Sequence, residues 1–189
     1  NTRRLVASEV AGASTLMDRI HKYNPTLTKD SDKTRKVVER LKSLEYRGYQ
    51  FEAADESLEL VIRRVLGVDR QFFRLEHFKI IGEQPLIARE YPSTAMIKVS
   101  VGDSSEVTAA EGDGPVHALD LALRKALVRF YPSLESVSLS DFKVRVLESD
   151  ATTAATVRVL IESTDGEHSW TTEGVSTDII EASFLALSD

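Results

Sequence analysis

The residues with the clearest chemical potential lie in a glycine-rich segment, TAAEGDGPVHALDLALRKALVRF, from Thr108 to Phe130. Its second half has the composition of an α-helix, with Gly114 at the N-cap and Pro115 as the first helical residue. Proline suits that position because its missing N–H would be unpaired there anyway. Glycine, however, has no side chain that could accept hydrogen bonds from the first-turn amides. Free amides at the positive end of a helix dipole favour an anion, so the segment predicts a small anion-binding site.

The surroundings of this helix start allow two interpretations. Gly112 and Gly114 would let a ligand approach the backbone closely, or they could form only a tight turn with water on the free amides. Apolar residues on the next two predicted strands could line a pocket: Phe142, Val144, Val146, Ala155 and Val157. The same residues would also fit an ordinary hydrophobic core.

Other catalytic arrangements are missing from the sequence. The four histidines are not spaced as metal ligands, and the acidic residues fall at predicted caps, turns and strand exteriors. No nucleophile elbow, phosphate loop or dinucleotide fingerprint occurs. His117 is the only histidine near the glycine-rich segment, and we expect it at the surface. Cysteine is absent, which excludes disulfides and thiolate chemistry.

The overall composition limits the kinds of partner. A net charge of −6 and the lack of a basic stripe argue against nucleic-acid binding. No apolar run approaches the roughly 20 residues of a membrane helix, and no secretory leader is recognisable, so we expect no membrane contact and a cytoplasmic location. Because the chain begins at Asn1 within structured-looking sequence, we expect it to be a piece of a longer protein.

The first third of the chain, residues 1–70, is predicted to be helical. Apolar residues recur at helical spacing in three segments, about residues 14–23, 31–47 and 55–66. Ser14 and Asp55 are predicted N-caps, and Gly67 is a predicted helix stop. The middle segment should turn one apolar face inward, made of Val37, Val38, Leu41 and Leu44.

From residue 71 onwards the apolar period changes to that of strands. The predicted order is three strands and a helix, twice, over about residues 75–131 and 136–189. TAAEGDGPVHALDLAL in the first copy resembles TTEGVSTDIIEASFLAL in the second, which indicates an internal duplication and pairs Gly114 with Asp178. Asp178 should cap its own helix, with Glu181 at capping-box spacing. The predicted fold class is therefore α+β, with a helical N-terminal subdomain followed by two βββα repeats.

Several motifs resemble a known family. TAAEGDGPVHALDLALRKAL, SDFKVRVLES with TAATVRVLIES, and GVSTDIIEASFLAL resemble the C-terminal regulatory domain of the 2-isopropylmalate synthase family, particularly its citramalate synthase branch. RRLVASEVAGAST and LKSLEYRGYQFEAADESLELVIRRVLG resemble the helical linker of that branch. The isopropylmalate branch tends to carry His-Ser-Gly where this chain has Val10-Ala11-Gly12, which favours citramalate synthase.

The resemblance implies a specific organisation. Residues 1–70 would be the helical linker, and residues 71–189 would be an effector-binding domain that forms a homodimer. The family condenses acetyl-CoA with a 2-oxo acid, pyruvate for citramalate synthase, in a metal-dependent N-terminal (β/α)8 barrel. That barrel is not in this chain. The divalent metal and acetyl-CoA would therefore belong to the missing barrel, and this chain would have no cofactor, no catalytic residue and no activity alone.

The resemblance also implies an effector site that uses the glycine-rich loop and apolar positions. Its residues would be Gly112, Asp113, Gly114, Pro115, Val116, Leu139, Phe142, Val146 and Ala155, with Thr153 and Thr177 at the edge. Tyrosine commonly stands in place of Phe142, so a hydroxyl contact would be missing here. A branched-chain amino acid fits this chemistry, because its carboxylate suits the amides and its side chain suits an apolar wall. Isoleucine is favoured; leucine, or a dimerisation module without ligand, are the alternatives.

Overall fold

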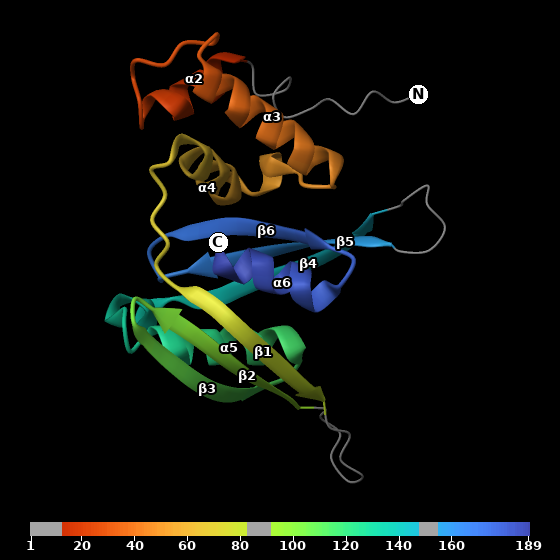
Figure 1. Cartoon of the computed structure of the whole chain (residues 1–189). Coiled ribbons are helices and arrows are strands. Elements are labelled where there is room, and N and C mark those ends of the chain that lie inside the picture. Colours follow the sequence, from red (N-terminus) through yellow and green to blue (C-terminus); the bar gives the residue numbers. More distant parts are fainter. Residues whose placement is uncertain (1–12, 83–91, 148–154) are drawn as a thin grey trace. The chain divides into compact units, whose positions relative to one another are not determined.

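The computed structural model describes residues 13–82, 92–147 and 155–189. The described residues form five α-helices and two three-stranded sheets, ordered β1-β2-β3 and β4-β5-β6 (Figure 1). The elements are α2 (Ala13–His21), α3 (Asp32–Tyr46), α4 (Asp55–Leu66), β1 (Arg74–Gly82), β2 (Ser93–Val101), β3 (Ser104–Gly112), α5 (Pro115–Leu127), β4 (Ser138–Leu147), β5 (Thr156–Thr164), β6 (Ser169–Ser176) and α6 (Ile179–Ser188). Strands and helices therefore follow the predicted βββα order twice, after a helical N-terminal part.

The chain divides into two compact units. Unit 1 comprises Asn1–Arg70, Phe142–Glu162 and Trp170–Asp189, and unit 2 comprises Gln71–Asp141 and Ser163–Ser169. Unit 1 thus combines the helical part with most of the second βββα repeat, while unit 2 contains the first repeat.

The helices α2, α3 and α4 form one hydrophobic core within unit 1. Its buried residues include Ile20, Val37, Leu41, Leu44, Phe51 and Ile62. The inward face predicted for α3 is confirmed, with Val38 only partly buried. Gly67 ends α4 in the left-handed conformation, at a φ of 76°, as its position after the last helical residue predicts.

Two predicted helix caps are wrong. Ser14 lies inside α2, which begins at Ala13. The N-cap of α4 is Ala54, and Asp55 is the first helical residue. The Asp55 carboxylate accepts a hydrogen bond from Arg19 at 2.9 Å, so a contact with a residue distant in sequence replaces the local cap.

In unit 2, α5 covers one face of the antiparallel sheet β1-β2-β3. Ala95, Ile97 and Val99 alternate along β2 and are completely buried, which agrees with the strand period predicted from residue 71 onwards. Ile97 lies opposite Thr108 of β3, and the Thr108 hydroxyl donates to the Ala122 carbonyl of α5 at 2.7 Å.

The second repeat repeats this packing. Thr172 of β6 donates to the Ala186 carbonyl of α6 at 2.6 Å, the same bond at the same position of the repeat as Thr108 makes in the first copy. Gly174 lies so close to α6 that an added Cβ would be 2.0 Å from the Ala182 carbonyl oxygen. The opposite face of β6 turns toward the N-terminal helical part, because Glu173 accepts from the backbone N–H of Gln50 (Figure 1). Strand β6 is therefore covered on both faces.

Candidate functional site

The start of α5 has the geometry that the sequence predicts. Gly114 is the N-cap, with φ −170° and ψ 172°, and Pro115 is the first helical residue. Among the side chains that the structure describes, none caps this helix end. In the second copy the Asp178 carboxylate accepts from the N–H groups of Ile180 and Glu181 at 2.7 and 3.0 Å, so the predicted cap of α6 is confirmed.

Comparing the two copies identifies the amides that a ligand would use. Val116 and His117 occupy the positions of Ile180 and Glu181, so their N–H groups correspond to the two that Asp178 caps. The next amide, Ala118 N–H, already bonds to the Gly114 carbonyl at 2.9 Å. Among the described residues, the open donors at this end are therefore a pair of neighbouring amides, which is suitable geometry for one carboxylate.

The two glycines of the loop differ in whether the fold requires them. A Cβ added at Gly112 would lie 2.5 Å from the Ala118 nitrogen, so close packing of β3 against α5 requires glycine there. A Cβ added at Gly114 would meet no atom within 4 Å, and its extended backbone is accessible to any residue. The fold therefore explains Gly112 but not Gly114.

The polar side chains beside the loop point to solvent. Asp113 is exposed, and its backbone N–H donates to Nδ1 of His117 at 3.3 Å. His117 is exposed, as predicted. The Asp113 carboxylate is thus free to approach a ligand at the helix end, although its distance of 3.7 Å from His117 Nδ1 places the ring nearby.

The predicted apolar wall is not assembled within one unit. Gly112–Val116 and Leu139 belong to unit 2, whereas Phe142, Val146, Ala155 and Thr177 belong to unit 1. Leu139 and Phe142 are half-buried, and the exposed residues are Val144, Val146, Ala155 and Thr177. Thr153 lies outside the described residues. Ligand contact at all of these positions stays a prediction.

The predicted capping box at α6 is only half formed. The Glu181 carboxylate accepts from the Ser176 hydroxyl instead of from the backbone N–H of Asp178. That N–H donates to Ser176 Oγ at 3.2 Å. Ser176 therefore stands between the two groups that a capping box would join directly.

The expectation that the acidic residues lie at exteriors is wrong for two of them. Glu173 is 0% exposed and Asp120 is 4% exposed. Asp120 pairs with Arg124 one turn later on α5, where Arg124 Nε donates at 3.0 Å. Glu173 is held by residues far away in sequence, which no local pattern encodes.

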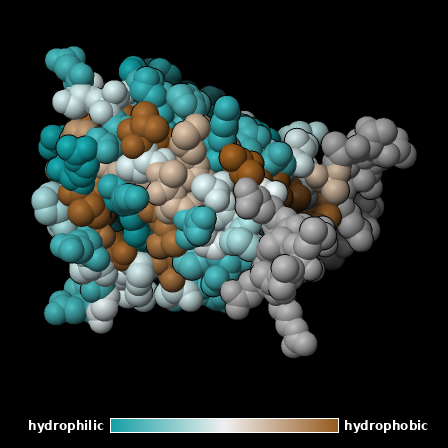
Figure 2. Space-filling model, turned by 90° about the horizontal axis from the view of Figure 1, so that it is seen from below, coloured by the Kyte–Doolittle hydropathy of each residue, from teal (hydrophilic) through white to brown (hydrophobic). Residues whose placement is uncertain are grey.

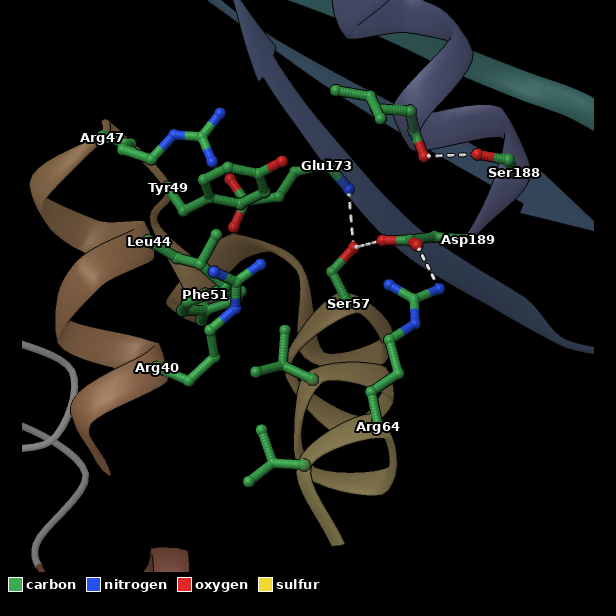
Figure 3. A pocket seen from close by; sticks show the side chains of 13 residues that line it. Arg40, Leu44, Arg47, Tyr49, Phe51, Ser57, Arg64, Glu173, Ser188 and Asp189 are labelled. Carbon is green, nitrogen blue, oxygen red and sulfur yellow. Dashed lines mark hydrogen bonds and ion pairs between the residues drawn. The ribbon is translucent and has the colours of Figure 1, made fainter. Parts of the chain in front are cut away.

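A chain of hydrogen bonds connects Glu173 to the helical part of unit 1. Both Glu173 carboxylate oxygens lie 3.1 Å from the backbone nitrogen of Gln50. The Glu173 N–H donates to Ser57 Oγ at 2.9 Å, and the Ser57 hydroxyl donates to Asp189 Oδ2 at 2.9 Å (Figure 3). Arg64 donates to Asp189 Oδ1 at 2.9 Å. These bonds join α4 and the segment before it to β6 and α6.

Burial changes the acidity of these carboxyl groups. It raises the pKa of Glu173 to about 7, and the negative charges of Asp189 and Glu45 act in the same direction. The Gln50 amide and the Arg158 guanidinium oppose this shift. Burial also raises the pKa of Asp189, against the opposing effect of Arg64.

A cavity of about 400 Å³ opens beside this hydrogen-bond chain, within unit 1. Its charged residues are Arg40, Arg47, Arg64, Glu173 and Asp189 (Figure 3). Sequence reasoning missed it. The one available signal was Gly174, because a glycine within a strand often indicates close approach of another backbone and hence a covered face.

The surface of unit 2 carries exposed apolar residues. Ile81 and Val107 are 53% and 56% exposed, and the strand register turns both away from α5. Figure 2 shows one face of the molecule, on which apolar side chains form small groups between polar ones.

Within the described ranges, no set of three or more acidic or histidine side chains converges as metal ligands would. No helix among the residues that the structure describes has the length and apolar character needed to cross a bilayer.

Paired βββα repeats with a helical extension and an uncapped helix end define a small α+β module. The family described as "LeuA allosteric (dimerisation) domain" matches residues 52–189, most of the chain. The chain therefore belongs to this family.

Related proteins agree with that assignment. The whole chain is 46% identical to a part of the (R)-citramalate synthase of Geobacter sulfurreducens and 42% identical to a part of that of Aquifex aeolicus. It is 43% identical to a part of the (R)-citramalate synthase of Sulfolobus acidocaldarius. In each case it covers only 34–36% of the relative, so the chain spans about a third of the length of these curated relatives.

Proposed function

We propose that this chain is the linker and regulatory region of a citramalate synthase, and that it forms a homodimer and binds isoleucine as a feedback inhibitor. The names of the relatives and of the family support the parent activity and the dimer. In this proposal the parent protein is cytoplasmic and condenses acetyl-CoA with pyruvate. The barrel that performs the reaction, with its divalent metal and acetyl-CoA, lies outside this chain, and no residue described above is assigned to it.

The observation that carries the effector proposal is the difference between Gly114 and Asp178. The two βββα repeats share their fold and a hydrogen bond from a buried threonine hydroxyl to a carbonyl of the repeat's helix. Only the second repeat, however, caps its helix with a carboxylate. A free amino acid would supply the missing carboxylate to the amides of Val116 and His117. Its ammonium group would face Asp113 or a loop carbonyl.

The aliphatic side chain of the effector would contact the predicted apolar positions. Val146 is 67% exposed, so its apolar surface is open to a ligand. Isoleucine and leucine differ by the position of one methyl group, which is worth roughly 1–3 kcal/mol in a fitted pocket. Leucine is therefore the alternative effector, and a dimerisation module without a ligand is the second alternative.

Calorimetric titration of the chain with isoleucine, leucine and valine tests the proposal. Saturable micromolar binding of isoleucine, weaker by about tenfold or more for the other two, is the expected result. Preferential leucine binding would support the first alternative, and no heat with any of the three would support the second. Light scattering on the same samples measures the mass, and a monomer at all concentrations would contradict the dimer.

A further inference from the structure

The cavity in unit 1 has the size and lining of a small-molecule site. Its volume of about 400 Å³ lies within the range of roughly 300–1,000 Å³ that is usual for such sites. Part of its wall is apolar and comes from Leu44, Phe51, Val61 and Leu185. The remaining wall is charged, so the cavity offers both an apolar surface and polar anchors.

The charges of this cavity do not balance. Asp189 is already occupied by Arg64 and the Ser57 hydroxyl, each at 2.9 Å. Glu173 accepts from Gln50 and, because burial raises its pKa to about 7, carries only part of a negative charge at neutral pH. The cavity therefore has more positive than negative charge.

The excess positive charge lies on α3 and at its C-cap. Arg40 and Arg47 are exposed and extend from α3 toward Tyr49 and Phe51 (Figure 3). In the part of the chain that the structure describes, neither guanidinium has a carboxylate within ion-pair distance. Guanidinium groups bind carboxylates through charge-assisted hydrogen bonds, so each of these two side chains is suited to an organic anion.

We propose that this cavity binds a small monocarboxylate with a short branched aliphatic body. Its carboxylate lies at Arg40 and Arg47, and its body packs against Leu44, Val61 and Leu185. An acid without an amine fits better than an amino acid, because the excess charge of the cavity is already positive. This ligand therefore differs from the amino acid proposed at α5, and the two proposals are independent.

Binding here would act on the packing inside unit 1. The arginines come from the N-terminal helical part, whereas Leu185 comes from α6 of the second repeat. One ligand would therefore contact both sides of the junction between these two parts, which the Ser57–Glu173 hydrogen bond also joins. A ligand that binds only the folded junction raises its stability by mass action. We therefore expect the ligand to raise the unfolding temperature as its concentration increases.

A ligand series tests the chemistry of the site. Amide spectra of the chain labelled with nitrogen-15 would be recorded with isovalerate, acetate, isobutylamine and inorganic phosphate at millimolar concentrations. Isovalerate should shift the signals of Gln50 and Glu173 saturably, and acetate should bind about ten times more weakly because it lacks the aliphatic body. Isobutylamine and phosphate should leave these signals unchanged. No saturable shift with isovalerate, or equal shifts with phosphate or isobutylamine, would overturn the proposal.

Matched variants test the anchors. The double variant Arg40→Gln with Arg47→Gln should weaken isovalerate binding at least about tenfold. Arg35→Gln, on the same helix but paired with Asp32 at 2.6 Å, is the control and should bind like the unaltered chain. Unchanged affinity in the double variant would refute the assignment, and the ligand series decides alone if that variant does not fold. Isoleucine titration of the same variant should be unaffected, which separates this proposal from the effector site.

Discussion

Replacing Gly114 by aspartate should give α5 the cap that α6 already has. The position accepts the change, because an added Cβ meets no atom within 4 Å and a φ of −170° suits any residue. The new carboxylate would reach the amides of Val116 and His117, as Asp178 reaches the corresponding pair at 2.7 and 3.0 Å. The substitution therefore removes the proposed anion site by filling it from within the chain.

This substitution should stabilise the fold but weaken the binding of isoleucine. The fold should gain about 0.5–1 kcal/mol from the cap and from the charge at the helix N-terminus, which corresponds to a rise in unfolding temperature of about 1–4 °C. An effector carboxylate would lose two charge-assisted hydrogen bonds, each worth roughly 1.5–3 kcal/mol. Isoleucine binding should therefore weaken by about 100-fold or more.

Titration calorimetry with isoleucine and thermal unfolding measure both effects on one protein. Gly114→Ala is the matched control, because it adds a Cβ but leaves the amides free, and it should bind isoleucine within about threefold of the unaltered chain. Gly114→Asp that is folded and still binds isoleucine normally would refute the capping argument. If the unaltered chain binds no branched-chain amino acid, the proposed function fails instead.

Three further substitutions test the hydrogen bonds around the buried Glu173 and the packing of β3 against α5. The pKa of Glu173 is raised from 4.5 to about 7, so between these pH values the folded state holds a proton that the unfolded state releases. The unfolding free energy should therefore fall by up to about 3 kcal/mol as pH rises through this window. In urea titrations, Glu173→Gln should abolish this pH dependence. Ser57→Ala leaves the buried Glu173 N–H without its acceptor and should cost about 1–3 kcal/mol by the same measurement, whereas a cost near zero would show that the bond is dispensable. Gly112→Ala should lower the unfolding temperature, because its Cβ would lie 2.5 Å from the Ala118 nitrogen, and unchanged stability would contradict the close packing.

Much of the fold is predictable because its signals are local. Ala95, Ile97 and Val99 alternate along one strand, and that alternation alone identifies the buried face of β2. Asp178 precedes a helix in the second copy and caps it, since an N-cap needs only the residues next to it. The difference between the two helix starts was therefore available from the sequence.

The features that sequence reasoning missed depend on residues far apart in the chain. Asp55 has the position and type of a helix cap, but Arg19 provides an ion-pair partner that the local sequence does not contain. Glu173 is buried because Gln50 and Ser57 approach from the N-terminal helices, more than a hundred residues away. Gly112 resembles a ligand-binding glycine in sequence, although the nearby helix backbone is sufficient to explain it.

The duplication shows how the two copies have become specialised. Thr108 and Thr172 keep the same bond to their helices, so the inner packing of both copies is maintained. On the opposite sheet face, the position of the buried Glu173 is occupied by the exposed Ala109 in the first copy.

The second copy thus uses its outer face to hold the N-terminal helices, while the first keeps an uncapped helix end that the second has closed. If this division is correct, Gly114→Asp should leave the pH dependence attributed to Glu173 unchanged. Glu173→Gln should likewise leave isoleucine affinity unchanged when both are measured at one pH. A loss of both properties in either variant would show that the two copies act as one site.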